Sequence, residues 1–161
     1  MIIDIQKYED RHRAQILALS LRSWAPVFTK LRPAVPAYVY DAFYPDDWEA
    51  RQAGDIDAFL QTEGRSAWVA CDGPDVVGWV GVRLHAEDHM GEVYIFAVDP
   101  DRQREGIATA LIDAAVAHMR LAGMRIVMVE TGDDPGHAAS RATYESNGFE
   151  RWPVARYVRK L

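Results

Sequence analysis

The stretch VDPDRQREGIATAL, residues 98–111, joins a charged loop directly to an apolar helical pattern. Five of its first eight residues are charged, and Gly106, Ile107 and Ala108 follow them. The apolar segment EVYIFAV, residues 92–98, precedes the loop and has the pattern of a buried strand. A strand, a loop and a helix in this order place unpaired backbone N–H groups and the positive end of the helix dipole at the loop. The stretch therefore predicts a turn that binds an anion.

Three properties of the loop favour a phosphate group as that anion. Arg102 and Arg104 supply positive charge, Gly106 lets oxygen atoms approach the main chain, and Ala108 keeps the next turn thin. A helix N-terminus contributes only about 0.3 to 1 kcal/mol per charge, so a pyrophosphate also needs several N–H donors and nearby cations. The loop lacks the GxxxxGK[ST] pattern of a P-loop and the GxGxxG pattern of a Rossmann turn. On spacing alone, a charged loop that faces solvent and binds nothing remains the alternative.

Size and composition predict one globular domain over residues 1–161. A chain of 161 residues buries roughly two-thirds of the surface that its unfolded form exposes. Its 49% hydrophobic and 26% charged residues are typical of a soluble protein, and no apolar run is long enough to span a membrane. The first residues lack a secretory signal pattern, and the single cysteine, Cys71, cannot form an internal disulfide. We expect an unprocessed cytoplasmic protein.

The charge pattern narrows the expected partners. A net charge of −6 repels a polyphosphate backbone, so nucleic acid is not an expected partner, whereas a cationic substrate is attracted. His85 and His89 lie four residues apart, but they flank an expected hairpin turn and no third ligand is evident. We predict no metal site. The sequence does not fix the oligomeric state, and a homodimer is compatible with it.

Apolar periodicity predicts a mixed α/β order of elements. Helical patterns cover a segment that Asp10 caps, with Leu17, Leu21, Trp24 and Phe28 on one face, and four further segments, residues 37–45, 46–64, 106–123 and 137–148. Strand patterns cover residues 1–5, 66–72, 76–85, 92–98 and 125–131, and a closing pair of strands within residues 149–161, interrupted by Pro153.

The loop also carries a resemblance to a known family. Gln103-Arg104-Glu105-Gly106-Ile107-Ala108 resembles the Q/R-x-x-G-x-G/A motif of the GNAT superfamily, the acetyl-CoA-dependent N-acetyltransferases. Residues 92–98 stand where that family has its fourth strand, and YESNGF, residues 144–149, is similar to its Y-x-x-x-G-F signature. The resemblance covers residues 66–149 well and the first 65 residues only by the order of elements. It implies a single-domain α/β (α+β) GNAT fold, with a mixed, mostly antiparallel sheet of about six to seven strands and about four flanking helices.

The resemblance also implies the position of acetyl-CoA. Main-chain groups of Phe96, Ala97 and Val98 would pair with the pantetheine arm, and Thr109 could add a hydroxyl. The pyrophosphate would lie against the N–H groups of Gln103, Arg104, Glu105, Gly106, Ile107 and Ala108. The chain departs from the family at His137, where an Asn that contacts pantetheine is frequent. An imidazole can still donate one hydrogen bond.

Acetyl transfer to an amine needs two proton movements. An alkyl ammonium with a pKa near 10.4 must lose a proton, which costs about 4.6 kcal/mol at pH 7. The resemblance places Glu92 where some family members have a base that acts through water; the alternative is a solvated glutamate at a strand end. It places Tyr144 as the general acid for the departing CoA sulfur, and the alternative is an aromatic ring that packs against Phe149.

The acceptor is expected to meet aromatic rings and carboxylates. In the family, the segment between the first two helices and the hairpin after the third strand line the acceptor site, and here they include Trp24, Phe28, Tyr40, Asp41 and Glu87. Such a lining suits a small cationic amine, either a polyamine or an aminoglycoside-type antibiotic whose acetylation gives resistance. The alternatives are that these residues are core rings and helix caps, that the acceptor is a protein N-terminus or lysine, and that the chain is a non-catalytic CoA-binding module.

Overall fold

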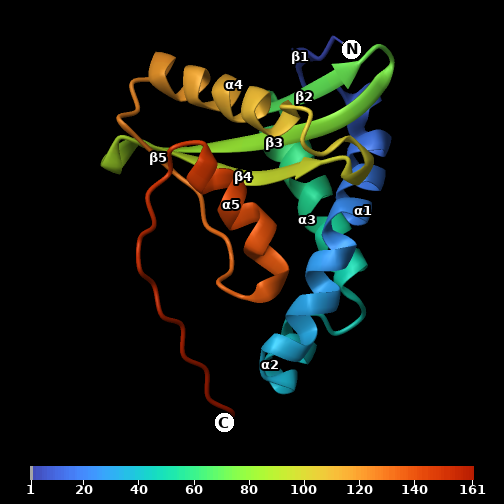
Figure 1. Cartoon of the computed structure of the whole chain (residues 1–161), viewed down its shortest axis with the longest axis vertical. Coiled ribbons are helices and arrows are strands. Elements are labelled where there is room, and N and C mark those ends of the chain that lie inside the picture. The colour runs from blue at the N-terminus through green and yellow to red at the C-terminus, as the bar shows by residue number, and fades with distance from the viewer. Residues whose placement is uncertain (1) are drawn as a thin grey trace.

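The strands of the sheet lie side by side in the order in which they occur along the chain (Figure 1). The computed structural model describes residues 2–161. Within them, the strands are β1 (Asp4–Lys7), β2 (Ala67–Asp72), β3 (Asp75–His85), β4 (Met90–Val98) and β5 (Ile126–Met128). The first four strands pair in antiparallel fashion, and β5 is parallel to β4. The predicted mixed, mostly antiparallel α+β fold is confirmed.

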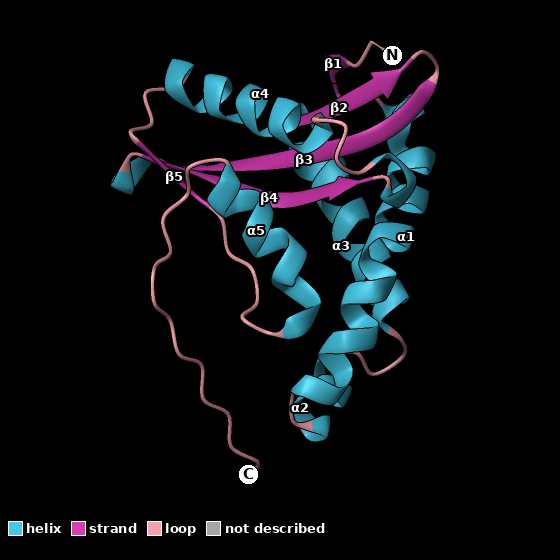
Figure 2. Ribbon diagram, viewed as in Figure 1, coloured by secondary structure: helices cyan, strands magenta, loops and turns pink. Residues whose placement is uncertain are grey.

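Two layers of helices cover the sheet (Figure 2). On one face, α1 (Arg13–Leu31) and α3 (Trp48–Glu63) pack against Trp79, and α2 (Ala37–Phe43) connects them. On the other face, α4 (Ile107–Leu121) packs against Val80 and Val93. The last helix, α5 (Ala138–Ser146), lies beside β4 and β5 (Figure 1). The described residues form five α-helices, which match the five helical segments that the periodicity predicts, whereas the family resemblance implied about four.

The predicted number of strands is wrong. The described residues form five strands instead of six to seven, because residues 149–161 contain no strand. Pro153 lacks a backbone donor, and the segment around it leaves the sheet as an extended chain (Figure 1). The expected face of α1 also differs, because Ile16, Leu19 and Ser20 are buried, whereas Leu17 is only partly so.

The pairing of β4 with β5 is short. Met90–Glu92 pairs with Ile126–Met128, after which the two segments are no longer paired. On its other side, β4 carries a bulge: Gly81 lies opposite Ile95 and Val82 opposite Val93, so Tyr94 is an extra residue. A bulge bends its strand and increases the local twist. Both features separate the C-terminal half of β4 from the chain that follows β5.

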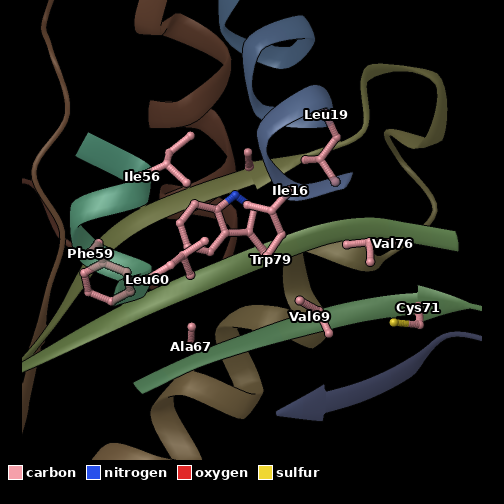
Figure 3. Close-up of a cluster of buried hydrophobic side chains, with 11 residues drawn as sticks. Ile16, Leu19, Ile56, Phe59, Leu60, Ala67, Val69, Cys71, Val76 and Trp79 are labelled. Atoms are coloured by element: carbon pink, nitrogen blue, oxygen red, sulfur yellow. The ribbon is translucent and has the colours of Figure 1, made fainter. Parts of the chain in front are cut away.

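A buried hydrogen bond fixes α1 to the sheet. The indole of Trp79 is fully buried and lies among Ile16, Leu19 and Ile56, as Figure 3 shows. Its Nε1 donates to the hydroxyl oxygen of Ser20 at 2.8 Å, and Ser20 is also fully buried. An indole N–H needs such a partner when it is removed from water. Ser20 therefore occupies a core-facing position on α1 because of its hydroxyl.

We predict that Ser20→Ala lowers the free energy of unfolding by about 1 to 3 kcal/mol, because it leaves the buried Trp79 N–H without its acceptor. Urea denaturation followed by tryptophan fluorescence measures the change. Ser146→Ala is the matched control, since Ser146 is exposed and donates to the Thr143 carbonyl, and should change stability by less than about 0.5 kcal/mol. Equal effects of the two variants would contradict the prediction.

Candidate active site

A cavity of about 300 Å³ lies where β4 and the chain after β5 separate. Its walls come from α1, α3, β4, the residues that follow β5, and α5. The lining residues are Trp24, Val27, Phe28, Gln52, Asp55, Val93, Tyr94, Ile95, Phe96, Val129, Glu130, Thr131, His137, Ser140 and Tyr144. The short β4–β5 pairing thus opens a cleft between the two strands, and the helices close its sides.

Tyr144 lies on α5 in the aromatic part of this cleft. Its ring centroid is 6.3 Å from that of Phe96 and 5.6 Å from that of Phe149. Burial raises the pKa of Tyr144 to about 12, from an ordinary value of 10. The phenol is therefore protonated at neutral pH and is available as a hydrogen-bond donor. The ring packs against Phe149, as the alternative interpretation expects, and it also lines the cleft, while its role as a general acid stays a prediction.

Hydrogen bonds fix the wall that carries His137. His137 Nδ1 lies 2.6 Å from Asp134 Oδ1, and the other oxygen of Asp134 accepts from the Gly136 N–H at 2.9 Å. Arg141 donates to the carbonyl oxygens of Gly132 and Asp134. Because Asp134 already engages Nδ1, Nε2 is the ring nitrogen of His137 left to reach a ligand.

The charged loop ends in two residues with left-handed backbone conformations. Arg104 has φ 66° and Gly106 has φ 82°, and Gly106 is the N-cap residue of α4. No side chain caps this helix N-terminus, so its first N–H groups are not satisfied in that way. A Cβ at Gly106 would meet no atom within 4 Å, which shows open space beside the helix start. This arrangement fits a phosphate group.

The two arginines of the loop differ in role. Arg102 donates to Asp72 at 3.0 Å and to Glu105 at 2.8 Å, and these contacts fix the loop against β2. Arg104 is exposed. Asp99 fixes the start of the loop, since its carboxylate accepts from the Asp101 N–H and lies 2.6 Å from the Arg22 guanidinium of α1. The carboxylates of Asp72 and Glu105 thus neutralise part of the positive charge that the sequence analysis assigned to a bound anion.

Glu92 lies on β4 next to this cleft but is not among the residues that line the cavity. His85 Nε2 is 2.9 Å from Glu92 Oε1, and the glutamate side chain is 18% exposed. This hydrogen bond raises the pKa of His85 above its ordinary value of 6.5. Glu92 is thus not a freely solvated carboxylate. The structure gives it a partner that the sequence analysis did not identify.

The five expected acceptor residues do not all meet in the cleft. Trp24 and Phe28 line it, and the Phe28 ring stacks on Trp48 at 4.5 Å. Tyr40 is buried on α2, where its ring packs against that of Tyr44 at 4.8 Å. Asp41, on α2, and Glu87, in the β3–β4 turn, are exposed and lie outside the cavity lining.

Sequence reasoning missed several polar residues of the lining, among them Gln52, Asp55 and Glu130. Gln52 and Asp55 lie on α3, seven and four residues before Phe59, so they extend the stripe of Ile56 and Phe59 that faces the core. Polar residues on the extension of an apolar stripe were the signal that could have identified them. Glu130 follows β5, and only the separation of β4 from β5 reveals its position.

A second cavity of about 310 Å³ adjoins the cleft. Gln52 and Asp55 line both cavities. The other residues of the second lining come from the α2–α3 corner and from the extended chain after α5, namely Phe43, Tyr44, Arg51 and Arg156. The cleft therefore continues past Asp55 toward the start of α3.

Two searches cover the part of the chain that the structure describes. Over residues 2–161, no helix is both long enough and apolar enough to cross a membrane. Within the same residues, no group of three or more His, Cys, Asp or Glu side chains is arranged to hold a metal ion.

Comparisons with known proteins identify relatives of this chain. The sequence model of the Acetyltransferase (GNAT) family matches residues 31–149. A mycothiol acetyltransferase of Kocuria rhizophila is 43% identical over 86 residues, which cover 50% of this chain and 28% of that protein. A mycothiol acetyltransferase of Saccharopolyspora erythraea is 30% identical over 128 residues, which cover 74% of this chain and 40% of that protein. The chain thus spans less than half the length of these relatives.

Solved structures share the fold. An aminoglycoside N-acetyltransferase, AAC(6')-Iy, in complex with CoA superimposes with a TM-score of 0.68 at 17% identity, over 99% of this chain and 95% of that chain. At this identity the similarity shows the fold and not the substrate.

We predict that Tyr144 ionises with a midpoint near pH 12, because the cleft keeps its phenolate from water. The difference between the ultraviolet titrations of the native protein and Tyr144→Phe isolates this ring from the other tyrosines. Between pH 10 and 12 the unfolded chain releases a proton that the folded chain retains, so stability falls as the pH rises through that window. A difference midpoint near pH 10 would show that the ring is solvated and the cleft more open.

Proposed function

The chain belongs to the GNAT acetyltransferase family, and from this membership we propose that it transfers an acetyl group from acetyl-CoA to a primary amine of a small cationic acceptor. One observation carries the choice of acceptor: the cleft between β4 and the chain after β5 is lined by aromatic rings and two carboxylates, Asp55 and Glu130. The proposal treats the chain as a single catalytic domain. A cytoplasmic location belongs to the same proposal and is supported by the single, buried Cys71.

The turn at the start of α4 is the proposed binding site for the donor. Residues 103–108 would hold the pyrophosphate through backbone N–H groups, with Thr109 adding its hydroxyl and the exposed Arg104 adding charge. The backbone of Phe96, Ala97 and Val98, at the end of β4, would pair with the pantetheine arm, and His137 would meet it from the opposite wall. Bound acetyl-CoA supplies an acetyl group already activated as a thioester.

Glu92 is the proposed acceptor of the amine proton, and His85 is the proposed residue that positions it. The acceptor ammonium must lose its proton before the nitrogen can attack, and Glu92 lies outside the cavity lining, so the proton would travel through water. His85, which is hydrogen-bonded to Glu92, would hold the carboxylate in place. Solvent as the only base is the alternative, and it predicts that Glu92→Gln leaves the pH dependence of the rate unchanged.

Tyr144 is the proposed donor to the departing sulfur. Its phenol, with a pKa raised to about 12, remains protonated throughout the physiological range. An ordinary thiol has a pKa near 8.5, so complete proton transfer from this phenol to a thiolate is uphill by about 3 to 4 units. Tyr144 would therefore stabilise the developing charge on sulfur mainly by a hydrogen bond, while the final proton comes from water.

The lining of the cleft supports a cationic amine as the acceptor. Asp55 and Glu130 offer charge-assisted hydrogen bonds, and Trp24 offers a ring to a cation. The Tyr94 ring is already engaged, because the Arg83 guanidinium lies 3.5 Å from its centroid and the Phe59 ring stacks on it. Polyamines and aminoglycoside-type amino sugars have this chemistry, and a role in antibiotic resistance would follow from the second class. The fold is shared with an aminoglycoside N-acetyltransferase in complex with a CoA-linked acetylneamine analogue, but that similarity does not establish the acceptor.

A protein N-terminus is the second candidate acceptor. The adjoining cavity extends the cleft past Asp55 to Arg51 and Arg156. An elongated groove fits a peptide better than it fits a compact amine. The ribosomal-protein-S18-alanine N-acetyltransferase of Escherichia coli also shares the fold, with a TM-score of 0.65 at 18% identity. A CoA-binding module without turnover is the remaining alternative, and it would bind acetyl-CoA but acetylate no amine.

We predict that Gly106→Val weakens acetyl-CoA binding by at least about tenfold, because a β-branched residue is strained at φ 82° and fills the open space beside the helix start. Isothermal titration calorimetry with acetyl-CoA measures this. Gly73→Val is a matched control: Gly73 has φ 59° and open space too, but it lies in the turn between β2 and β3. Unchanged affinity in a folded Gly106→Val protein would remove the loop from the donor site.

We predict that the double variant Asp55→Asn and Glu130→Gln raises KM for a polyamine or amino sugar roughly threefold to thirtyfold, since both residues are exposed and each carboxylate contributes a modest attraction. KM for acetyl-CoA should not change. A free-thiol turnover assay against polyamines, amino sugars and N-terminal peptides measures both constants. Asp113→Asn on α4 removes an exposed carboxylate outside both cavities and serves as the control. An unchanged acceptor KM in the double variant would contradict the proposed acceptor site.

A further inference from the structure

The extra residue of the β4 bulge, Tyr94, belongs to the wall of the cleft, yet the proposed chemistry gives it no role. Its neighbours Val93 and Ile95 line the same cleft. A bulge changes the direction in which a strand aims its side chains, so the ring of Tyr94 needs contacts of its own to stay in one place. The contacts that fix this ring therefore also fix the shape of the cleft beside the bulge.

One contact with the ring comes from Arg83 on β3. The guanidinium carbon of Arg83 lies 3.5 Å from the centroid of the Tyr94 ring. Glu63, the last residue of α3, accepts two hydrogen bonds from the same guanidinium, at 3.0 Å from Nε and 2.8 Å from Nη2. A bidentate pair of this kind fixes the orientation of the guanidinium plane. Glu63 therefore holds Arg83 in the position from which it packs on the ring.

A second contact comes from Phe59 on α3. The Phe59 and Tyr94 rings stack with their centroids 5.4 Å apart, and Phe59 is almost fully buried in the core around Trp79 (Figure 3). Gly81 leaves room for the Phe59 ring, because a Cβ at Gly81 would lie 2.6 Å from atoms of both Phe59 and Ile95. The hydrophobic core thus also holds the bulge residue.

Arg83 and Glu63 lie outside both cavity linings. Arg83 therefore acts on an acceptor in the cleft through another residue, and its surroundings offer two routes. The first is the Tyr94 ring, which it contacts. The second is Glu92, which lies directly opposite Arg83 in the strand register, but the carboxylate of Glu92 is hydrogen-bonded to His85. The hydrogen bonds of Arg83 go to Glu63, so the contacts favour the route through Tyr94.

We propose that Arg83 is a positioning residue for the acceptor: it fixes the Tyr94 ring in the cleft wall and so sets the width of the acceptor site at the β4 bulge. Glu63 supports it by fixing the guanidinium. An acceptor amine meets this ring only in the cleft, so the proposal rests on the proposed acetyl transfer. Loss of the Arg83 contact frees the ring and weakens acceptor binding, whereas the donor turn at the start of α4 is unaffected.

The position of the Tyr94 ring is testable without turnover. In a protein with isotope-labelled tyrosine, Tyr94→Phe identifies the nuclear magnetic resonance signal of the Tyr94 ring by its disappearance. We expect Glu63→Gln to shift this signal, because Glu63 is bonded to Arg83 and its loss frees the guanidinium. Asp57→Asn is the matched control, since it breaks the Arg13–Asp57 ion pair between α1 and α3 and should leave the signal in place. A Tyr94 signal that Glu63→Gln does not move would overturn the proposal.

The kinetic constants test the consequence for the acceptor. Arg83→Lys keeps the positive charge but loses the bidentate pair and the planar contact with the ring. We expect KM for the amine acceptor to rise roughly threefold to tenfold, with kcat and the acetyl-CoA affinity changed less than about twofold. Arg13→Lys, the same change at the Arg13–Asp57 pair, should leave all three constants unchanged. In a Tyr94→Leu background, Arg83→Lys should have no further effect on KM.

The possible outcomes separate this proposal from the proposed function. A KM that rises equally in the Tyr94→Leu background would show that Arg83 does not act through this ring, and would overturn the proposal. A changed pH dependence of the rate in Arg83→Lys would overturn it too, because it would show that Arg83 acts through Glu92. If no amine is acetylated, the proposed function fails, and the ring signal alone decides whether Glu63 and Arg83 fix Tyr94.

Discussion

The limited pairing of β4 with β5 is the constraint on which the rest of the site depends. Three residues of each strand pair in parallel, and a bulge at Tyr94 then bends β4 away from the chain that follows β5. A parallel pair needs a crossover, and α4 is that crossover, so its N-terminus lies beyond the C-terminal end of β4. The proposed donor turn and the cleft with Tyr144 thus lie at the separating end of the same strand.

Electrostatic pairing changes how the site residues can act. Arg102, which the sequence suggests as an anion ligand, is engaged by Asp72 and Glu105 and fixes the loop, so the backbone N–H groups carry more of the proposed anion binding. Glu92 is engaged by His85, so the carboxylate of the proposed base is held in place, and the same hydrogen bond raises the pKa of His85. In the cleft, Asp55 lies 4.0 Å from the Arg51 guanidinium, so Glu130 and a partly compensated Asp55 supply the negative charge for the proposed ammonium acceptor.

Local sequence signals predicted the parts of the fold that depend on local interactions. The helix that starts after Gly106, the apolar stripe of α4 and the hairpin between β2 and β3 follow from residue type and spacing. Asp55 and Glu130 escaped prediction because their position in the cleft depends on how separate elements pack. The segment after Phe149 has the composition of strands, but strand formation also needs a partner edge, which the pattern does not supply.

The turnover of Tyr144→Phe tests the account most directly, because this change removes only the hydroxyl from a ring that also packs against Phe96 and Phe149. With the best amine acceptor, we expect kcat to fall by about 100-fold or more, the range of a lost acid or hydrogen-bond donor, while acetyl-CoA affinity changes less than about threefold. A kcat within about twofold of the native value, with the protein folded and acetyl-CoA bound, would contradict the claim that the β4–β5 cleft places Tyr144 at the reacting sulfur.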